Sequence, residues 1–105
     1  MTDNLNKKLE IGKEYYHSIK AEASKMYFIG KVNEGRETSF RFARPTDKGY
    51  DILETDCMEM NSDGETFRST GKMKIYWIYD IPKSPCYAPK LYSQIKKVIG
   101  EVKRK

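Results

Sequence analysis

Residues 26–44 read MYFIGKVNEGRETSFRFAR and contain the clearest hairpin pattern of the chain. The first part, 26–32, is rich in the aromatic and branched side chains that favour strands. The segment 33–37 contains glycine and is typical of a hairpin loop. In 38–44 the phenylalanines alternate with smaller or polar residues, as in a strand with one buried face. The stretch therefore predicts two antiparallel strands joined by a short loop.

Turn-forming residues divide the next part of the chain into further strands. Pro and Gly in 45–49 (PTDKG) predict a turn, after which 51–60 forms a third strand. The segment 61–65 (NSDGE) is a second hairpin signal. Residues 67–80 then return as one long strand or two shorter ones, with one face made of Met73, Ile75, Trp77 and Tyr79.

The C-terminal segment 90–103 has the strongest helical periodicity. Its apolar residues recur at the spacing of one helix face, and Pro89 suits the first helical position. The stripe consists of Leu91, Ile95, Val98, Ile99 and Val102. We expect Leu91, Ile95 and Ile99 to be buried against the sheet.

The N-terminal quarter has a weaker helical stripe. Its apolar residues follow one another at spacings of four, four, four and three: Ile11, Tyr15, Ile19, Ala23 and Met26. Helix formers also dominate 20–25, so this segment predicts an amphipathic helix before the first strand. A strand over 10–19 is the alternative, because Ile11, Tyr15 and Ile19 would then share a face as well.

These segments predict an α+β fold in a single domain that spans residues 1–105. It consists of a four-stranded antiparallel β-meander with an N-terminal and a C-terminal helix packed on the sheet. A small β-barrel with a terminal helix is the alternative. A chain of 105 residues can bury about 60–70% of its unfolded surface, which is enough for one core.

We expect a cytoplasmic protein without a membrane partner. The first residues contain no apolar signal-peptide core, and no stretch approaches the roughly 18 apolar residues of a membrane span. Cys57 and Cys86 lie far apart, whereas disulfide-rich secreted domains have more cysteines and zinc sites have close pairs. Two free thiols in a reducing compartment are therefore expected.

No constellation of catalytic residues is recognisable. His17 is the only histidine, and no serine or cysteine accompanies it in a known catalytic order. The carboxylates of 51–65 lack the spacing of a calcium loop and fall on both faces of the predicted strand. We expect a surface histidine, a solvated acidic rim, no metal, no cofactor and no enzymatic activity. An enzyme with an unfamiliar site is the alternative.

Charge is distributed unevenly along the chain. The net charge is +5, yet 50–65 has six acidic and no basic residues, whereas 84–105 has six basic and one acidic. A small accessory protein that binds nucleic acid would place its cations against phosphates. The residues expected to do so lie in the basic hairpin and the C-terminal helix: Lys31, Arg36, Arg41, Arg44, Lys96 and Lys97.

The aromatic hairpin adds a second argument for nucleic acid. Residues 27–32 (YFIGKV) resemble one ribonucleoprotein-motif strand of the RNA recognition modules, and the segment around Phe40 and Phe42 loosely resembles the other. In that family two aromatic strands stack bases, so the resemblance implies single-stranded nucleic acid. The family places a helix and a strand between its motifs, where this chain has a short loop. The sequence nevertheless favours the other placement, in which Phe28, Phe40 and Phe42 face the core, because they are among the most apolar residues of the chain and one sheet face must bury something.

A protein-binding module is the alternative function. The short chain, the missing catalytic residues and the separate acidic and basic segments also suit a regulator or inhibitor of a larger protein complex. A lone domain of this kind would fit a viral or mobile-element origin. The expected partner is thus nucleic acid or a larger protein complex.

Overall fold

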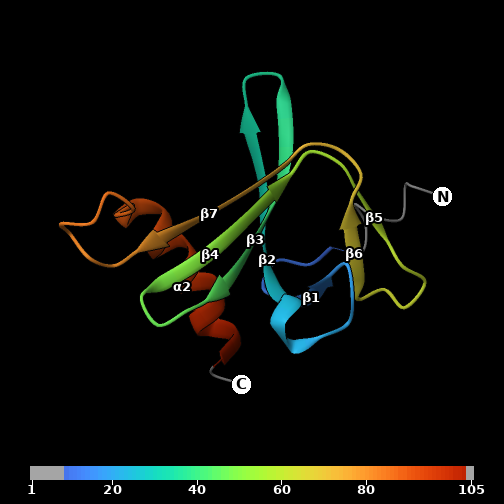
Figure 1. The fold of residues 1–105 in the computed structure, drawn as a ribbon, viewed down its shortest axis with the longest axis horizontal. Helices are drawn as coiled ribbons and strands as arrows, with labels where there is room; N and C mark the ends of the chain where they lie inside the picture. The colour runs from blue at the N-terminus through green and yellow to red at the C-terminus, as the bar shows by residue number, and fades with distance from the viewer. Residues whose placement is uncertain (1–8, 104–105) are drawn as a thin grey trace.

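The computed structural model describes residues 9–103, apart from the side chains of Glu34 and of residues 101–103. Its strands form one mixed sheet in the order β5-β6-β1-β2-β3-β4-β7 (Figure 1). The short 3-10 helix η1 (Glu22–Ser24) joins β1 to β2, and α2 (Pro89–Lys103) follows the last strand. The strands are β1 (Glu14–His17), β2 (Lys25–Glu34), β3 (Glu37–Pro45), β4 (Gly49–Thr55), β5 (Met58–Met60), β6 (Thr66–Ser69) and β7 (Met73–Tyr79).

The prediction of a four-stranded meander with helices at both ends is wrong. In residues 9–103 the sheet has seven strands, and β1 and η1 stand where that part of the N-terminal helix was expected. Gly12 and Ser18 have φ angles of 91° and 71°, which are incompatible with a right-handed helix. Tyr15 is fully buried, whereas Ile11 and Ile19 are exposed, so the apparent stripe is not a packing face. The alternative of a strand in this region is closer to the structure.

Strands β4 to β7 form one long hairpin that bends in the middle. β4 pairs with β7 and β5 pairs with β6, both in antiparallel register. The predicted strand 51–60 is therefore divided in two. At the bend, Asp56 N donates to Lys72 O at 3.2 Å, and Lys72 N donates to Asp56 Oδ1 at 2.8 Å. The hydroxyls of Thr55 and Ser69 share a hydrogen bond of 2.6 Å.

The far half of this hairpin returns to the N-terminal strand. β6 pairs with β1 in parallel, with Tyr16 beside Thr66 and His17 beside Phe67. Tyr16 N donates to Glu65 O at 2.7 Å, and Ser18 N donates to Phe67 O at 2.5 Å. This parallel pair makes the sheet mixed, which no local sequence pattern indicated.

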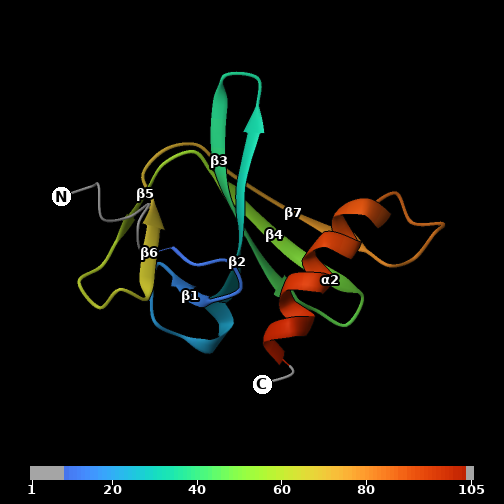
Figure 2. The same ribbon diagram turned by 180° about the vertical axis from the view of Figure 1, so that it is seen from behind.

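Helix α2 covers one face of the sheet, over β2, β3, β4 and β7 (Figure 2). Ile95 and Ile99 are buried there, and Leu91 is half-buried against the same cluster. The prediction that the C-terminal helix packs on the sheet is confirmed for Ile95 and Ile99, whereas Leu91, also expected to be buried, is only partly so. The strand side chains beneath it are Tyr27, Ala43, Tyr50, Ile52 and Ile78.

The other face is covered by the bent sheet itself. A second core joins β1, β5 and β6 to β2, β3 and β4, through Tyr15, Met26, Phe28, Phe42, Leu53, Met58 and Phe67. Phe28 and Phe42 are buried and Phe40 packs against them. The aromatic residues of the hairpin therefore face the core, which confirms the alternative to base stacking. No helix within residues 9–103 is long and apolar enough to cross a membrane.

Candidate functional site

Two of the six predicted basic residues are held in ion pairs. Arg41 Nε donates to Glu54 Oε2 at 2.9 Å, on the α2 face of the sheet. Arg44 lies on the opposite face, where it donates to Asp51 Oδ2 at 2.6 Å and also to Ala23 O. The structure therefore does not bring these two arginines together into one basic surface.

The other four lie on separate parts of the molecule. Lys31 is exposed, with its ammonium 5.6 Å from the centroid of the Phe40 ring. Arg36 is exposed in the turn of the β2–β3 hairpin, which extends beyond the sheet and away from α2 (Figure 2). Lys96 and Lys97 are exposed on α2. The hairpin and the helix thus offer two distant basic positions.

The acidic segment is dispersed among different partners. Asp51 and Glu54 pair with the two arginines, Asp56 caps the hairpin bend, and Glu59 pairs with Arg68 at 2.8 Å. Further along, Glu65 pairs with Lys20 at 2.8 Å, and Asp63 accepts hydrogen bonds within its own turn. The expected solvated acidic rim is consequently interrupted, because Glu54 is buried.

Glu54 is the centre of a small polar network. Its carboxylate accepts hydrogen bonds from Arg41 and from the Tyr76 hydroxyl, and Lys74 lies 3.9 Å away. Burial raises the pKa of Glu54, but the hydrogen bonds from Tyr76 and Arg41, together with the positive charges of Arg41 and Lys74, lower it by more, so the net pKa lies below its ordinary value. Burial and the bond to Glu54 raise the pKa of Tyr76. The network is satisfied internally and supports the fold.

Most of the large exposed apolar side chains in the described residues lie on β7, an edge strand of the sheet, and in the loop after it. Met73, Ile75 and Trp77, which we call the β7 face, are 46%, 58% and 50% exposed. The loop after β7 adds exposed Ile81 and Tyr87. Five of the seven large exposed apolar residues in the described part of the chain therefore gather in one segment. Contiguous apolar surface of this kind marks interaction sites.

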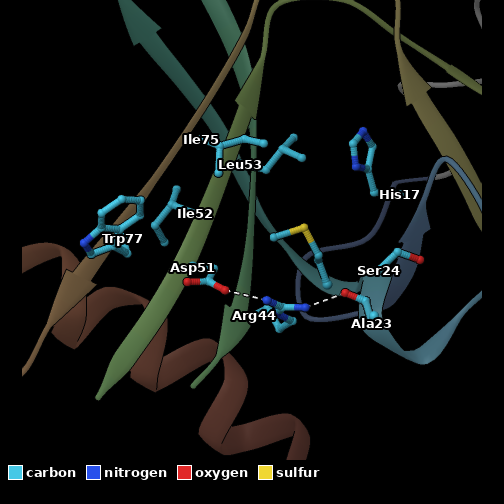
Figure 3. A pocket seen from close by; sticks show the side chains of 10 residues that line it. His17, Ala23, Ser24, Arg44, Asp51, Ile52, Leu53, Ile75 and Trp77 are labelled. Carbon is cyan, nitrogen blue, oxygen red and sulfur yellow. Dashed lines mark hydrogen bonds and ion pairs between the residues drawn. The ribbon is translucent and has the colours of Figure 1, made fainter. Parts of the chain in front are cut away.

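A groove of about 440 Å³ lies beside the β7 face (Figure 3). One wall is formed by Ile75 and Trp77 with Leu53 of β4, and the opposite wall by η1 and His17. Between the walls, the Arg44 guanidinium donates to Asp51 and to the main-chain oxygen of Ala23. The charges of Arg44 and Asp51 therefore neutralise each other within the groove. We call this the β7 groove.

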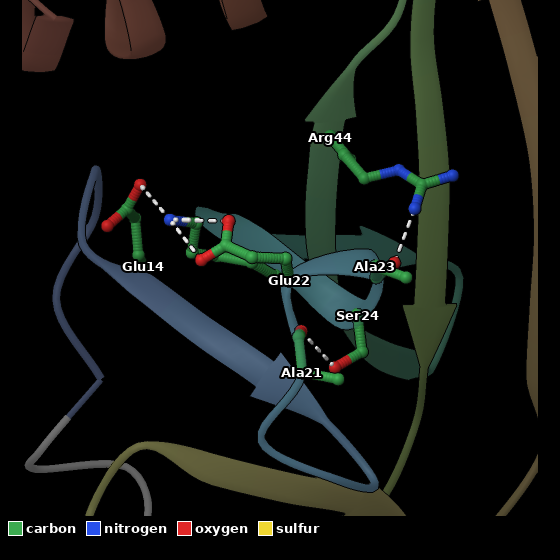
Figure 4. Close-up of polar contacts among 7 residues, drawn as sticks. Glu14, Ala21, Glu22, Ala23, Ser24 and Arg44 are labelled. Atoms are coloured by element: carbon green, nitrogen blue, oxygen red, sulfur yellow. Dashed lines mark hydrogen bonds and ion pairs between the residues drawn. The ribbon is translucent and has the colours of Figure 1, made fainter.

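The η1 wall is fixed by polar contacts (Figure 4). Ser24 Oγ lies 2.9 Å from Ala21 O and 2.6 Å from Ile19 O, so its single proton is shared between the two carbonyl oxygens. Lys25 Nζ lies 3.2 Å from Glu22 and 3.8 Å from Glu14, which ties η1 to β1. These contacts hold η1 in place beside β1 and β2.

His17 differs from the expected surface histidine. It lies on β1, is half-buried, and its ring centroid is 5.3 Å from that of Phe67. Burial lowers the pKa of His17 below its ordinary value, which favours the neutral imidazole. The histidine lines the groove with a half-buried ring that packs against Phe67.

Residues 9–103 contain no group of three or more His, Cys, Asp or Glu side chains placed to hold a metal ion. Cys57 is exposed and Cys86 half-buried, both as free thiols. Neither cysteine lines the β7 groove.

The sequence pattern located β7 but did not identify its exposed face. Both faces of this strand are apolar, since Tyr76 and Ile78 pack near α2 while the β7 face points the other way. A helix can cover only one of the two faces. The presence of apolar residues on both faces was the sequence signal that one of them would be exposed. His17 and Ala23 reach the groove through β1 and η1, which the expected helix concealed.

No family model, no curated protein and no solved structure matches this chain.

Proposed function

We propose that this chain is a protein-binding module whose partner inserts apolar side chains into the β7 groove. The observation that carries the proposal is the continuity of the groove with the exposed β7 face. The apolar surface extends along the strand beyond the groove, since Met73 does not line it. A protein partner can cover that length, whereas a small ligand would occupy the groove alone.

The composition of the site favours an apolar contact. Trp77 is among the residue types that most often dominate binding energy at protein interfaces. Arg44 and Asp51 neutralise each other, and burial favours the neutral form of His17 by lowering its pKa, so a partner needs no buried charge of its own. This supports the alternative function given above, a regulator or inhibitor of a larger complex.

The test uses variants on the two walls of the groove. Ala23→Arg fills it from the η1 side, and Trp77→Ala removes the aromatic wall. Ile11→Arg is the matched control, because Ile11 is 64% exposed and does not line the groove. Each protein is immobilised on beads and incubated with an extract of the source cell. Wild type and Ile11→Arg are expected to retain a protein that both groove variants lose.

The retained protein is then purified and titrated directly. Trp77 is the only tryptophan of the chain, so its emission is expected to shift to shorter wavelength as the partner covers it. Equal retention by all four proteins, or an unchanged emission spectrum on titration, contradicts the proposal.

A further inference from the structure

The β7 groove contains one ionisable side chain that has no counter-ion. Most of the lining is apolar, and the two charged side chains, Arg44 and Asp51, pair with each other at 2.6 Å. His17 stands on the wall opposite Trp77 (Figure 3). In the described part of the chain no hydrogen bond or ion pair involves its imidazole, which packs beside the ring of Phe67. A protonated imidazole at this position therefore depends on water for its solvation.

The charged side chains on the elements around β1 do not supply that counter-ion. They form pairs among themselves: Lys20 with Glu65, Lys25 with Glu14 and Glu22, and Arg68 with Glu59. Burial alone shifts the pKa of His17, and it lowers that pKa. Even the open groove therefore disfavours the charged imidazole.

We propose that protonation of His17 and occupation of the β7 groove by an apolar partner exclude each other, so that the protein binds its partner at neutral pH and releases it in acid. The inference rests on the proposed function, because it concerns the regulation of the same groove. A partner that covers the groove removes the water around the imidazole. A charged ring would then be buried without a hydrogen-bond partner or a counter-ion, which is strongly unfavourable.

The direction of the pH dependence follows from linkage between the two binding events. A partner that binds only the neutral imidazole lowers the pKa of His17 further, and protonation weakens the binding of the partner by the same factor. The affinity is therefore complete above the His17 pKa of the free protein and is lost as the pH falls through it. Because burial holds that pKa below the ordinary value of 6.5, release occurs only in acid.

The chain offers one reporter on each wall of the groove, because His17 is its only histidine and Trp77 its only tryptophan. The probe is N-phenyl-1-naphthylamine, an uncharged apolar dye, and the quenching of Trp77 emission measures its binding. Its dissociation constant is expected to rise about tenfold for each pH unit below the His17 pKa. In proton NMR, dye at about ten times its dissociation constant is expected to move the titration midpoint of the His17 ring signals about one pH unit lower.

Variants separate His17 from the other titrating group of the groove. His17→Gln and His17→Phe cannot be protonated, and either variant is expected to bind the dye equally at neutral pH and below the His17 midpoint. Asp51→Asn is the matched control, since it removes the other titration and leaves His17 in place. Its dye binding is expected to fall through the His17 midpoint, as in wild type. Ala23→Arg is expected to abolish dye binding, which locates the dye in the groove.

Dye binding that is absent, that survives Ala23→Arg, or that does not change through the His17 midpoint overturns the proposal. A His17→Gln variant with the pH dependence of wild type overturns it too, and so does a loss of dye that coincides with unfolding in circular dichroism. The extract experiment at neutral pH tests the proposed function separately. A retained protein together with pH-independent dye binding leaves the function standing without the pH switch, whereas pH-linked dye binding without a retained protein does the reverse.

Discussion

The rings of Phe42 and Phe67 are stacked, with centroids 4.2 Å apart and planes inclined by 14°. One ring comes from β3 and the other from β6, in the far half of the bent hairpin. Both side chains are fully buried. The contact fastens the two halves of the sheet to each other, and the first prediction concerns its contribution to stability.

Phe67→Ala is expected to lower the free energy of unfolding by about 3–5 kcal/mol, because it removes a large buried ring and leaves a cavity. Urea unfolding followed by circular dichroism measures this change. Ile19→Ala is the control, since Ile19 is exposed and its loss is expected to change stability by less than about 0.5 kcal/mol. Similar stability of the two variants would mean that β6 does not cover the core.

Ile95→Ala is expected to cost about 2–5 kcal/mol, since Ile95 is fully buried between α2 and the sheet. Lys96→Ala, one position along the same helix and exposed, is expected to cost no more than about 0.5 kcal/mol. Thermal melts of both variants measure the difference. A stable Ile95→Ala variant would contradict the packing of the helix on the sheet.

Arg41→Leu is expected to cost about 3–5 kcal/mol at neutral pH, because it leaves the buried Glu54 carboxylate without its closest cation. The pKa of Glu54 lies below its ordinary value of 4.5 in the folded protein. Its charged form therefore stabilises the fold above that pH, and this contribution is lost as the pH falls through the folded pKa.

The cost of Arg41→Leu is consequently expected to shrink in acid. Urea unfolding of wild type and variant at neutral pH and below the ordinary pKa of glutamate measures the trend. A cost that does not change with pH would show that the guanidinium contributes by packing and not by its charge.

Two glycines are expected to respond to alanine in opposite ways. At Gly49 a Cβ would overlap the Ile78 carbonyl oxygen and lie 2.9 Å from Tyr79 Cα, so Gly49→Ala is expected to weaken the β4–β7 pairing and cost about 1–3 kcal/mol or more. Gly100 lies in α2 with open space around the same position, and Gly100→Ala is expected to gain about 1 kcal/mol. Melting temperatures that move in the same direction would contradict this.

Nucleic-acid binding stays a prediction from the charge of the chain. If it is measured by fluorescence anisotropy with short oligonucleotides, we expect it to depend on Lys96 and Lys97, which are exposed, and not on Arg44, which is paired. Lys96→Glu with Lys97→Glu should weaken binding to all sequences and flatten the salt dependence by about one unit per lost contact. Absence of binding at low salt would exclude this function.

Local patterns predicted the β2–β3 hairpin, strands in the segments 51–60 and 67–80, and the C-terminal helix, because each depends on neighbouring residues, but they missed β1. Alternation around Phe40 and Phe42 and the periodic stripe through Ile95 and Ile99 correspond to buried faces in the structure. The N-terminal segment was misassigned because Ile11, Tyr15 and Ile19 satisfy both a helical and a strand spacing. Only tertiary contacts select the strand, since Tyr15 packs beside Phe42 at 6.3 Å between ring centroids.

The candidate site was less predictable, because it too depends on tertiary contacts that local patterns do not specify. Arg41 and Arg44 count as basic residues in the sequence, yet their charges are neutralised by Glu54 and Asp51 across the β3–β4 pair. The register that brings these residues together is set by the turn between the two strands. The exposed side of β7 likewise depends on where α2 packs, which a strand pattern alone does not specify.

The parallel pair of β1 and β6 has a kinetic consequence. Strands β2 to β5 lie between β1 and β6 along the chain. The β1–β6 pairing therefore closes a far longer stretch of chain than the β2–β3 or β5–β6 hairpin does, and such closures are slow. We therefore expect the β1–β6 pairing to form after the local hairpins during folding. In pulse-labelling hydrogen exchange, the amides of Tyr16 and Ser18, which bond to Glu65 and Phe67, should become protected after those of the β2–β3 hairpin.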